Sequence, residues 1–276
     1  MLIVFFGYTS LLACWLPVSA RLAWLAIAAN AGVIAGCWLL RWAETLRHQH
    51  FFNIVRDWYP VPFILLAYRE IGWFAPAVHN YKLENAWIVW DRLLLNHWGL
   101  KGLVEAAGPV GPSVLEMAYL SYYALPLSAV AILYLSSARA KVDRLLTQLL
   151  MAVFLAYALF PLFPSEPPRT VFPGQDLPSH QTVLRTFNLW ILGDWGIHTS
   201  VFPSVHATAA FSVAFAMMRL LPGRKWIGRS LLLQAVLIAV ATVYGRYHYA
   251  VDGLAGLATA LVALLVSLAI ERRSGL

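Results

Sequence analysis

The sequence predicts an all-α protein, a polytopic membrane bundle of about six to eight spanning helices. Of its 276 residues, 61% are hydrophobic and only 12% are charged, and the mean hydropathy is +0.68. Soluble domains ordinarily contain about 25% charged residues. The chain has too few charged residues to cover a soluble domain of this size, so a membrane is the expected environment.

Seven apolar segments are expected to cross the membrane, because a spanning helix needs about 20 mostly apolar residues. In chain order they lie near 2–18, 21–40, 113–136, 145–163, 204–220, 230–246 and 253–270. An eighth segment, near 54–74, contains four charged residues and two prolines. Neighbouring helices would have to satisfy its broken backbone, so this segment is the weakest of the predicted spans.

The first apolar segment ends in the small residues Ser19 and Ala20, which could indicate a cleaved signal peptide. A signal peptide begins with a positive region, however, and no basic residue precedes Arg21. We therefore expect a first helix that is retained. The two cysteines, Cys14 and Cys37, lie in apolar segments and are expected to pack as small hydrophobic residues.

Basic residues predict which helix ends face the cytoplasm, because short cytoplasmic loops are rich in lysine and arginine. Four basic clusters occupy alternate connections: Arg41, Arg47 and Arg56; Arg139, Lys141 and Arg144; Arg219, Arg224, Lys225 and Arg229; and Arg272 and Arg273. The connections 164–203 and 247–252 are then expected to face outward, into the periplasm if the membrane is a bacterial cytoplasmic one. Because the basic residues are scattered over short loops, nucleic acid is not an expected partner.

A histidine and an aspartate occupy the predicted start of the last helix. In Arg246-Tyr247-His248-Tyr249-Ala250-Val251-Asp252 they are four residues apart, which places them on one helical face. The carboxylate of Asp252 can hold the proton on one ring nitrogen of His248. The other nitrogen then remains available as a nucleophile or a base.

A second motif, Phe202-Pro203-Ser204-Val205-His206, precedes another predicted span. Proline followed by serine is typical of a helix start, where free backbone N–H groups attract phosphate oxygens. His206 lies about one turn into this helix and can give or take the proton of a leaving group. Ser204 is a candidate phosphate ligand, although a serine there also serves as a helix cap.

Two arginines are candidates to hold a phosphate group, Arg169 in the outer loop and Arg246 two residues before His248. Asp194 and His198 lie just before Phe202 and are expected to be loop caps at the rim of the pocket. This set of residues requires no metal ion and no cofactor, and the spacing of a two-histidine helical zinc motif is absent from the sequence.

These motifs resemble those of the type 2 phosphatidic acid phosphatase superfamily, which pairs Pro-Ser-x-His with a later His-x-x-x-Asp and an upstream Pro-Pro-Arg. Within it, the chain most resembles the fungal inositol phosphorylceramide synthases. The residues that carry this second resemblance are Arg56-Asp57-Trp58-Tyr59-Pro60, Tyr68-Arg69-Glu70-Ile71-Gly72, the series Tyr157, Pro161, Pro167 and Pro168, and His248-Tyr249 followed by Asp252-Gly253 and Gly256.

The resemblance implies a six-helix core preceded by N-terminal helices, and a role for each site residue. His248 would be the nucleophile that becomes a phosphohistidine, and Asp252 would orient it. His206 would act as general acid and then as general base, while Ser204 and Arg169 would contact the phosphate.

The chain departs from the phosphatase branch of the superfamily at two places. That branch carries a lysine and a Ser-Arg pair where this chain has Leu162 and Ala241-Thr242. Arg246 can supply a replacement charge, an inference from its position and not from the family pattern. These departures weaken the phosphatase assignment more than the fold assignment.

We expect a single integral membrane domain over 1–276, because no soluble insertion, repeat or low-complexity tract is visible. Residues 1–112 would form the N-terminal helices and an interfacial segment, and 113–276 the catalytic core. Within the first part, 84–98 combines apolar residues at helical spacing with charges and three tryptophans, typical of a helix in the headgroup layer. We expect that helix to help form the lipid entrance.

The predicted activity is cleavage of a lipid phosphoester, with a phospholipid or lipid phosphate as substrate. A lipid alcohol would then receive the phosphoryl group, or water would release it as in a lipid phosphate phosphatase. The subfamily resemblance favours transfer. A non-catalytic lipid-phosphate binder or transporter remains a third hypothesis, although binding alone gives no reason for an aspartate to orient a histidine. A metal-dependent hydrolase is the fourth hypothesis. The sequence does not indicate the oligomeric state.

Overall fold

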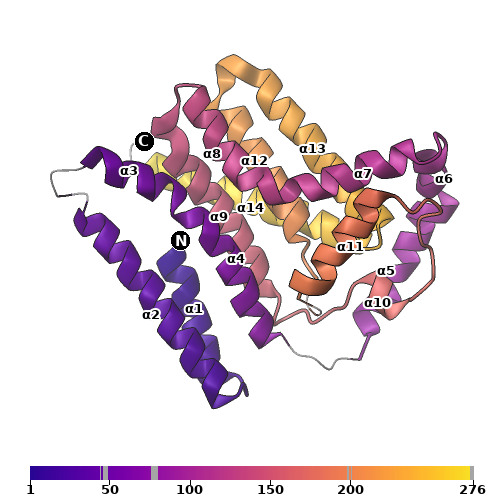
Figure 1. Ribbon diagram of the computed structural model, residues 1–276, viewed down its shortest axis with the longest axis horizontal. Helices are drawn as coiled ribbons and strands as arrows, with labels where there is room; N and C mark the ends of the chain where they lie inside the picture. The colour runs from indigo at the N-terminus through magenta and orange to yellow at the C-terminus, as the bar shows by residue number, and fades with distance from the viewer. Residues whose placement is uncertain (44, 46–48, 76–79, 198, 200, 274–276) are drawn as a thin grey trace.

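The computed structural model describes residues 1–43, 45, 49–75, 80–197, 199 and 201–273, and these form helices and loops without a strand (Figure 1). This confirms the predicted all-α class. The helices are α1 (Leu2–Trp15), α2 (Ala20–Ala43), α3 (Gln49–Trp58), α4 (Pro60–Ile71), α5 (Lys82–Arg92), α6 (Leu100–Glu105), α7 (Val110–Ser121), α8 (Leu125–Leu135), α9 (Val142–Leu159), α10 (Pro168–Val171), α11 (Val183–Trp195), α12 (Val205–Leu220), α13 (Lys225–Tyr244) and α14 (Ala250–Arg273).

Five helical stretches in the described residues are long and apolar enough to cross a membrane. They are α2, Val110–Leu135 (α7 and α8 together), Arg139–Leu159 (α9 with a preceding turn), Pro222–Tyr244 (α13 with a preceding turn) and α14. α1 and α12 are shorter apolar helices. The chain is therefore an integral membrane protein, and the predicted apolar segments correspond to these seven elements.

The segment near 54–74 is not one helix but two, α3 and α4, which meet at Tyr59. Pro60 and Pro62 lack the N–H donors that would continue the hydrogen bonding of α3, and Pro60 instead begins α4. Asp57, near the end of α3, is buried and accepts hydrogen bonds from Arg139 Nε at 2.8 Å and from the Tyr134 hydroxyl at 2.5 Å. Its charge is therefore compensated inside the protein, away from the site described below.

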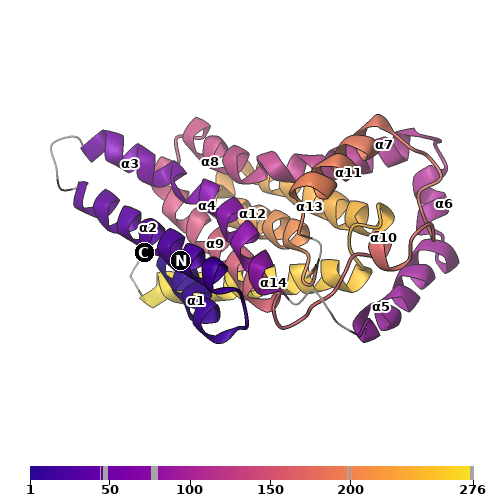
Figure 2. The same ribbon diagram turned by 60° about the horizontal axis from the view of Figure 1, so that its bottom comes forward.

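The centre of the bundle is α12, which packs against α13, α14 and α9. Its buried face is rich in alanine, including Ala207, Ala210 and Ala214, and small residues allow membrane helices to approach closely. Figures 1 and 2 show α1 and α2 at one end of the molecule and α5 and α6 at the opposite end. The helices that carry the histidine motifs lie between these two ends.

α12 and α14 begin side by side, because α13 runs back between them along the chain. The backbone N–H of Ser204, just before α12, donates to the carbonyl oxygen of Asp252 in the first turn of α14, at 3.0 Å. Gly256, one turn further along α14, permits this approach, since a Cβ atom there would lie 2.7 Å from the Ser204 carbonyl oxygen. The two histidine motifs are thus held together by the backbone.

Candidate active site

His248 lies in the short loop between α13 and α14, and Asp252 holds its ring. The Nδ1 atom of His248 is 3.3 Å from Oδ2 of Asp252, and the same oxygen accepts the backbone N–H of Tyr249 at 2.9 Å. The backbone N–H of His248 donates to the Thr242 carbonyl at 3.0 Å. Asp252 is fully buried, so its carboxyl group is directed at the loop and has no access to solvent.

His206 lies in the first turn of α12 and faces His248, with 5.5 Å between the ring centroids. Its ring stacks on Tyr119, at 4.6 Å and an interplanar angle of 19°, and contacts Tyr122 at 4.2 Å. Neither ring nitrogen has a hydrogen-bond partner within the described part of the chain. Both nitrogens of His206 are therefore buried without a protein partner in that part of the chain.

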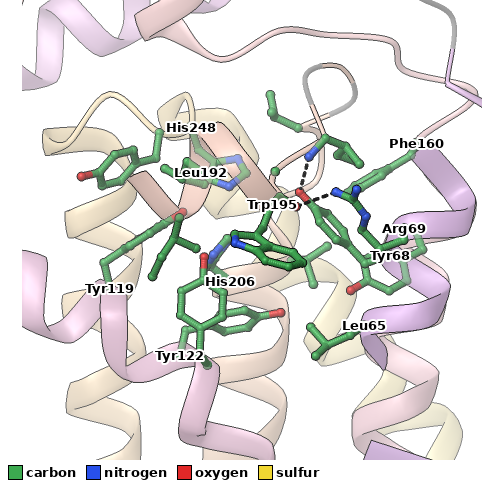
Figure 3. Close-up of a pocket in the computed structure, with 18 of the residues that line it drawn as sticks. Leu65, Tyr68, Arg69, Tyr119, Tyr122, Phe160, Leu192, Trp195, His206 and His248 are labelled. Atoms are coloured by element: carbon green, nitrogen blue, oxygen red, sulfur yellow. Dashed lines mark hydrogen bonds between the residues drawn. The ribbon is translucent and has the colours of Figure 1, made fainter. Parts of the chain in front are cut away.

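The two imidazoles line one cavity of about 340 Å³, shown in Figure 3 with the histidines on the same side of it. Apolar and aromatic side chains form most of its wall, and Arg169 is also part of it. The lining residues include Leu65, Tyr68 and Arg69 from α4, Tyr119 from α7, Tyr122 and Tyr123 from the turn after it, Tyr157 from α9, and Leu192 and Trp195 from α11.

Arg169 lines the cavity together with the two imidazoles. Its Nη1 atom donates to the Tyr247 carbonyl at 3.4 Å, and its guanidinium lies 5.8 Å from the centre of the Tyr247 ring. Burial lowers the pKa of Arg169 from its ordinary value. Burial, followed by the positive charge of Arg169, also lowers the pKa of His248 to about 3. The His248 imidazole is therefore neutral at physiological pH.

Ser204, Arg246 and Asp252 are buried beside the cavity and do not line it. Ser204 caps α12, because its Oγ accepts the backbone N–H of Ala207 at 3.4 Å. Arg246 Nη1 pairs with Asp91 of α5 at 2.7 Å. The structure thus brings His206, His248, Asp252 and Arg169 together, whereas the phosphate-binding roles of Ser204 and Arg246 stay predictions. In the described residues no three His, Cys, Asp or Glu side chains gather as metal ligands.

The rim of the cavity lies between α4 and α11, where Leu65 and Trp195 are each more than 60% exposed. Arg69 bridges the two helices by donating from Nη1 to the Trp195 carbonyl at 2.9 Å. No described residue of α5 lines the cavity, so the expectation that the interfacial helix forms its entrance is wrong. Asp194 is exposed on α11, and His198 lies outside the described residues.

Helix α5 instead contacts the loops that carry the histidine motifs. Trp87 stacks on Phe202 at 5.2 Å and meets the Tyr249 ring at 5.6 Å. Asp91 accepts the backbone N–H of Ala250 at 2.8 Å, in addition to the ion pair with Arg246. The helix thus supports the site from behind.

Sequence reasoning missed the aromatic wall contributed by Tyr119, Tyr122 and Tyr123. One signal was present, because these tyrosines cluster inside an otherwise apolar predicted span, where hydroxyl groups need a reason to be buried. Asp91 was also missed as a partner of Arg246, and no local pattern could have paired residues that far apart.

These features define a polytopic membrane protein in which histidines from two adjacent helix starts share one largely apolar cavity. The chain belongs to the PAP2 superfamily, whose profile matches residues 86–266 and so includes both histidine motifs and Arg169. This confirms the superfamily that the motifs indicate, whose members are generally phosphatases or phosphotransferases.

One relative is a PA-phosphatase related-family protein from Dictyostelium discoideum, which is 30% identical over 118 residues. The match covers 41% of this chain and 21% of the relative, so it spans about a fifth of that protein's length. No solved structure matches the chain.

Proposed function

We propose that this protein is a lipid phosphotransferase that works through a phosphohistidine, similar to the inositol phosphorylceramide synthases. The observation that carries the proposal is the pairing of His248 and His206 across one cavity, with Asp252 behind the first imidazole and, among the described residues, nothing holding the nitrogens of the second. A binding site for phosphate would need cations and N–H donors, but it would need neither a carboxylate-oriented imidazole nor a second, free one.

In the first step, the His248 nitrogen remote from Asp252 attacks the phosphorus atom of a lipid phosphoester. The bond between phosphorus and the lipid oxygen breaks, and His206 gives its proton to that oxygen. Asp252 keeps the other ring nitrogen of His248 in place. Arg169 stabilises the negative charge on the phosphoryl oxygens as the bond order changes.

In the second step, His206 takes the proton of an acceptor hydroxyl, whose oxygen attacks the phosphorus atom and displaces His248. The wall of the cavity and its rim between α4 and α11 are mostly apolar. They favour a lipid alcohol as the acceptor, because its hydrocarbon chains are apolar too. The same residues would release inorganic phosphate if water were the acceptor of a phosphoryl group, so a lipid phosphate phosphatase is the alternative.

The active site is proposed to face outward across the membrane in which the protein lies, for example the cytoplasmic membrane of a bacterium. What supports this side is that α12 and α14 end far from their histidine motifs, and the basic residues Arg219 and Arg272 lie near those distant ends. Basic ends face the cytoplasm. In a background without native cysteines, a cysteine introduced at the exposed Ser179 of the outer connection 164–203 should react with a membrane-impermeant maleimide in intact cells.

The decisive experiment follows labelled phosphorus in purified protein. Phospholipids labelled in the headgroup phosphate, and a panel of lipid phosphates, are incubated with and without diacylglycerol or ceramide. Transfer predicts label on the added lipid alcohol, and a phosphatase would release free phosphate. No movement in any mixture, with His248→Ala indistinguishable from the parent, would overturn the catalytic assignment in favour of a binder.

A further inference from the structure

A buried ion pair lies directly behind the aromatic wall of the cavity. Glu116 on α7 and Arg185 on α11 each have a side chain that is 3% exposed, and Arg185 Nη1 is 3.1 Å from Glu116 Oε1. Asn188 Nδ2 donates to Glu116 Oε2 at 2.8 Å, and the Tyr247 hydroxyl donates to the same oxygen at 2.7 Å. A buried carboxylate is costly unless its oxygens are paired, and here three side chains satisfy Glu116.

Tyr247 connects this ion pair to the motif loop. It immediately precedes His248, and Arg185 Nη1 donates to the carbonyl of Gly245, two residues before Tyr247, at 3.1 Å. The guanidinium of Arg185 also lies 5.6 Å from the centre of the Tyr247 ring. The cluster therefore fixes both the backbone of the loop and the direction of the Tyr247 side chain.

Tyr119 lies between Tyr247 and His206 and contacts both rings. Its ring centroid is 4.3 Å from that of Tyr247 on one side and 4.6 Å from that of His206 on the other. Glu116 and Tyr119 are three residues apart on α7, so they share one side of the helix. Tyr247, Tyr119 and His206 thus form a continuous series of ring contacts that begins at a buried carboxylate.

The two histidines differ in how they are oriented. Asp252 holds His248 by a hydrogen bond, but His206 has none in the described residues, and its plane is restricted by contacts with the rings of Tyr119 and Tyr122. An imidazole that must donate to a leaving group and later accept from an acceptor cannot have either role occupied by a fixed partner. Stacking meets this need, because it restricts the ring without using a nitrogen.

We propose that Glu116, acting through Tyr247 and Tyr119, is a positioning residue for His206. The inference rests on the proposed function, because it concerns the residue assigned there as general acid and base. Weakening the cluster should leave the fold in place while letting the His206 ring leave its productive plane. The loss should then fall on steps that need a proton. Any shift of the loop that carries His248 would slow the turnover of every ester alike.

The test compares two phosphoesters of the same acid, one of an aliphatic alcohol and one of p-nitrophenol. An aliphatic alkoxide leaves poorly without a proton, whereas p-nitrophenolate leaves without help. General acid catalysis contributes roughly 10²–10⁴-fold, so Glu116→Gln should lower the aliphatic-to-nitrophenyl ratio of kcat/KM by about tenfold or more. Partial unfolding would lower both rates equally and leave the ratio unchanged.

Asp57 provides a matched control. It is also a buried carboxylate paired with an arginine and a tyrosine, Arg139 and Tyr134, but on a different part of the fold. Asp57→Asn should therefore reduce the amount of folded protein without changing the ratio. If Glu116→Gln does not accumulate, Tyr247→Phe removes only the hydroxyl that reaches Glu116, and it should lower the ratio in the same direction.

His206→Ala gives the reference value for complete loss of the acid. In that background Glu116→Gln should change the ratio no further, since two residues that act through one group are not additive. A parent protein with no turnover of either ester would refute the proposed function. An active parent whose ratio survives Glu116→Gln and Tyr247→Phe would refute only the positioning role.

Discussion

The contact between Gly256 and the start of α12 yields a quantitative prediction. A Cβ atom at Gly256 would lie 2.7 Å from the Ser204 carbonyl oxygen, 3.0 Å from Ala207 Cβ and 3.1 Å from the Thr208 nitrogen. Ordinary van der Waals contact begins at 3.4 Å, so Gly256→Ala must move backbone by several tenths of an ångström. Because α12 and α14 carry the two histidine motifs, this displacement changes the distance between the imidazoles.

The expected change in the free energy of unfolding caused by Gly256→Ala has two opposing parts. Overpacking a well-filled contact destabilises a protein by about 1–3 kcal/mol, while replacing glycine by alanine within a helix stabilises it by about 0.5–1 kcal/mol. At Gly253, on the same helix, no atom lies within 4 Å of the position that an added Cβ would occupy. Gly253→Ala should therefore show the helix gain alone, and the difference between the two variants should be about 1–3 kcal/mol.

Two assays on the same preparations check this reasoning. Gly256→Ala should unfold at a temperature several degrees below Gly253→Ala, since 1 kcal/mol corresponds to roughly 2–4 °C at this size. Its turnover of a lipid phosphoester should fall about tenfold or more, because a misplacement of about 1 Å can cost 10²-fold. Equal unfolding temperatures and equal turnover in the two variants would show that the helices separate at no cost, contrary to the packing described above.

Four further outcomes are expected. His248→Ala should abolish turnover while lipid binding, measured by co-purification of labelled phospholipid, stays largely intact; residual turnover near that of the parent would exclude His248 as the nucleophile. Because the pKa of His248 is lowered to about 3, its neutral form should persist as pH falls past 6.5. With a phosphodiester substrate, which does not itself titrate in this range, the acidic limb of a bell-shaped kcat/KM profile should lie well below that value, and a midpoint at 6.5 would contradict the burial of the imidazole. Incubation with a chelator should leave turnover unchanged, and a loss restored by a divalent metal would require a different mechanism. Trp87→Ala should reduce turnover more than Trp90→Ala, because Trp87 contacts Phe202 and Tyr249 whereas Trp90 is 64% exposed; the opposite order of the two variants would argue against support of the site by α5.

Short-range features of the site could be predicted from the sequence. The spacing of His248 and Asp252 fits one helical turn, and the structure places their side chains 3.3 Å apart. Ser204 was identified as a possible cap because proline and serine favour a helix start, and it caps α12. These relations depend on local backbone geometry, which few residues determine.

Relations between distant segments could not be predicted in this way. Arg246 has the charge and the position of a phosphate ligand, yet its Nη1 atom pairs with Asp91, 155 residues earlier. The entrance was expected at the tryptophan-rich α5, but the cavity opens beside α4 and α11. Amphipathic spacing shows that a helix has an apolar face and does not show which neighbour that face will contact.

The membrane spans were predictable where composition was uniform. The segment 54–74 was the weakest of the predicted spans because of its charges and prolines, and the structure shows the break there, with α3 ending at Trp58 and Pro60 beginning α4. The charged residues of this segment were a better guide to its structure than the apolar ones. A buried carboxylate in a membrane protein needs partners, and Arg139 and Tyr134 supply them to Asp57.

The pairing of Asp91 with the last loop also sets an order of events during synthesis. Asp91 enters the membrane region long before its partners, Arg246 and the N–H of Ala250, have left the ribosome. Until the final hairpin inserts, Asp91 lacks both of the partners that it has in the folded protein. The contacts of α5 with the last loop are therefore completed only when α14 inserts, and the same insertion brings Asp252 to the loop that carries His248. The packing of α5 and the placement of His248 would then be a single folding event.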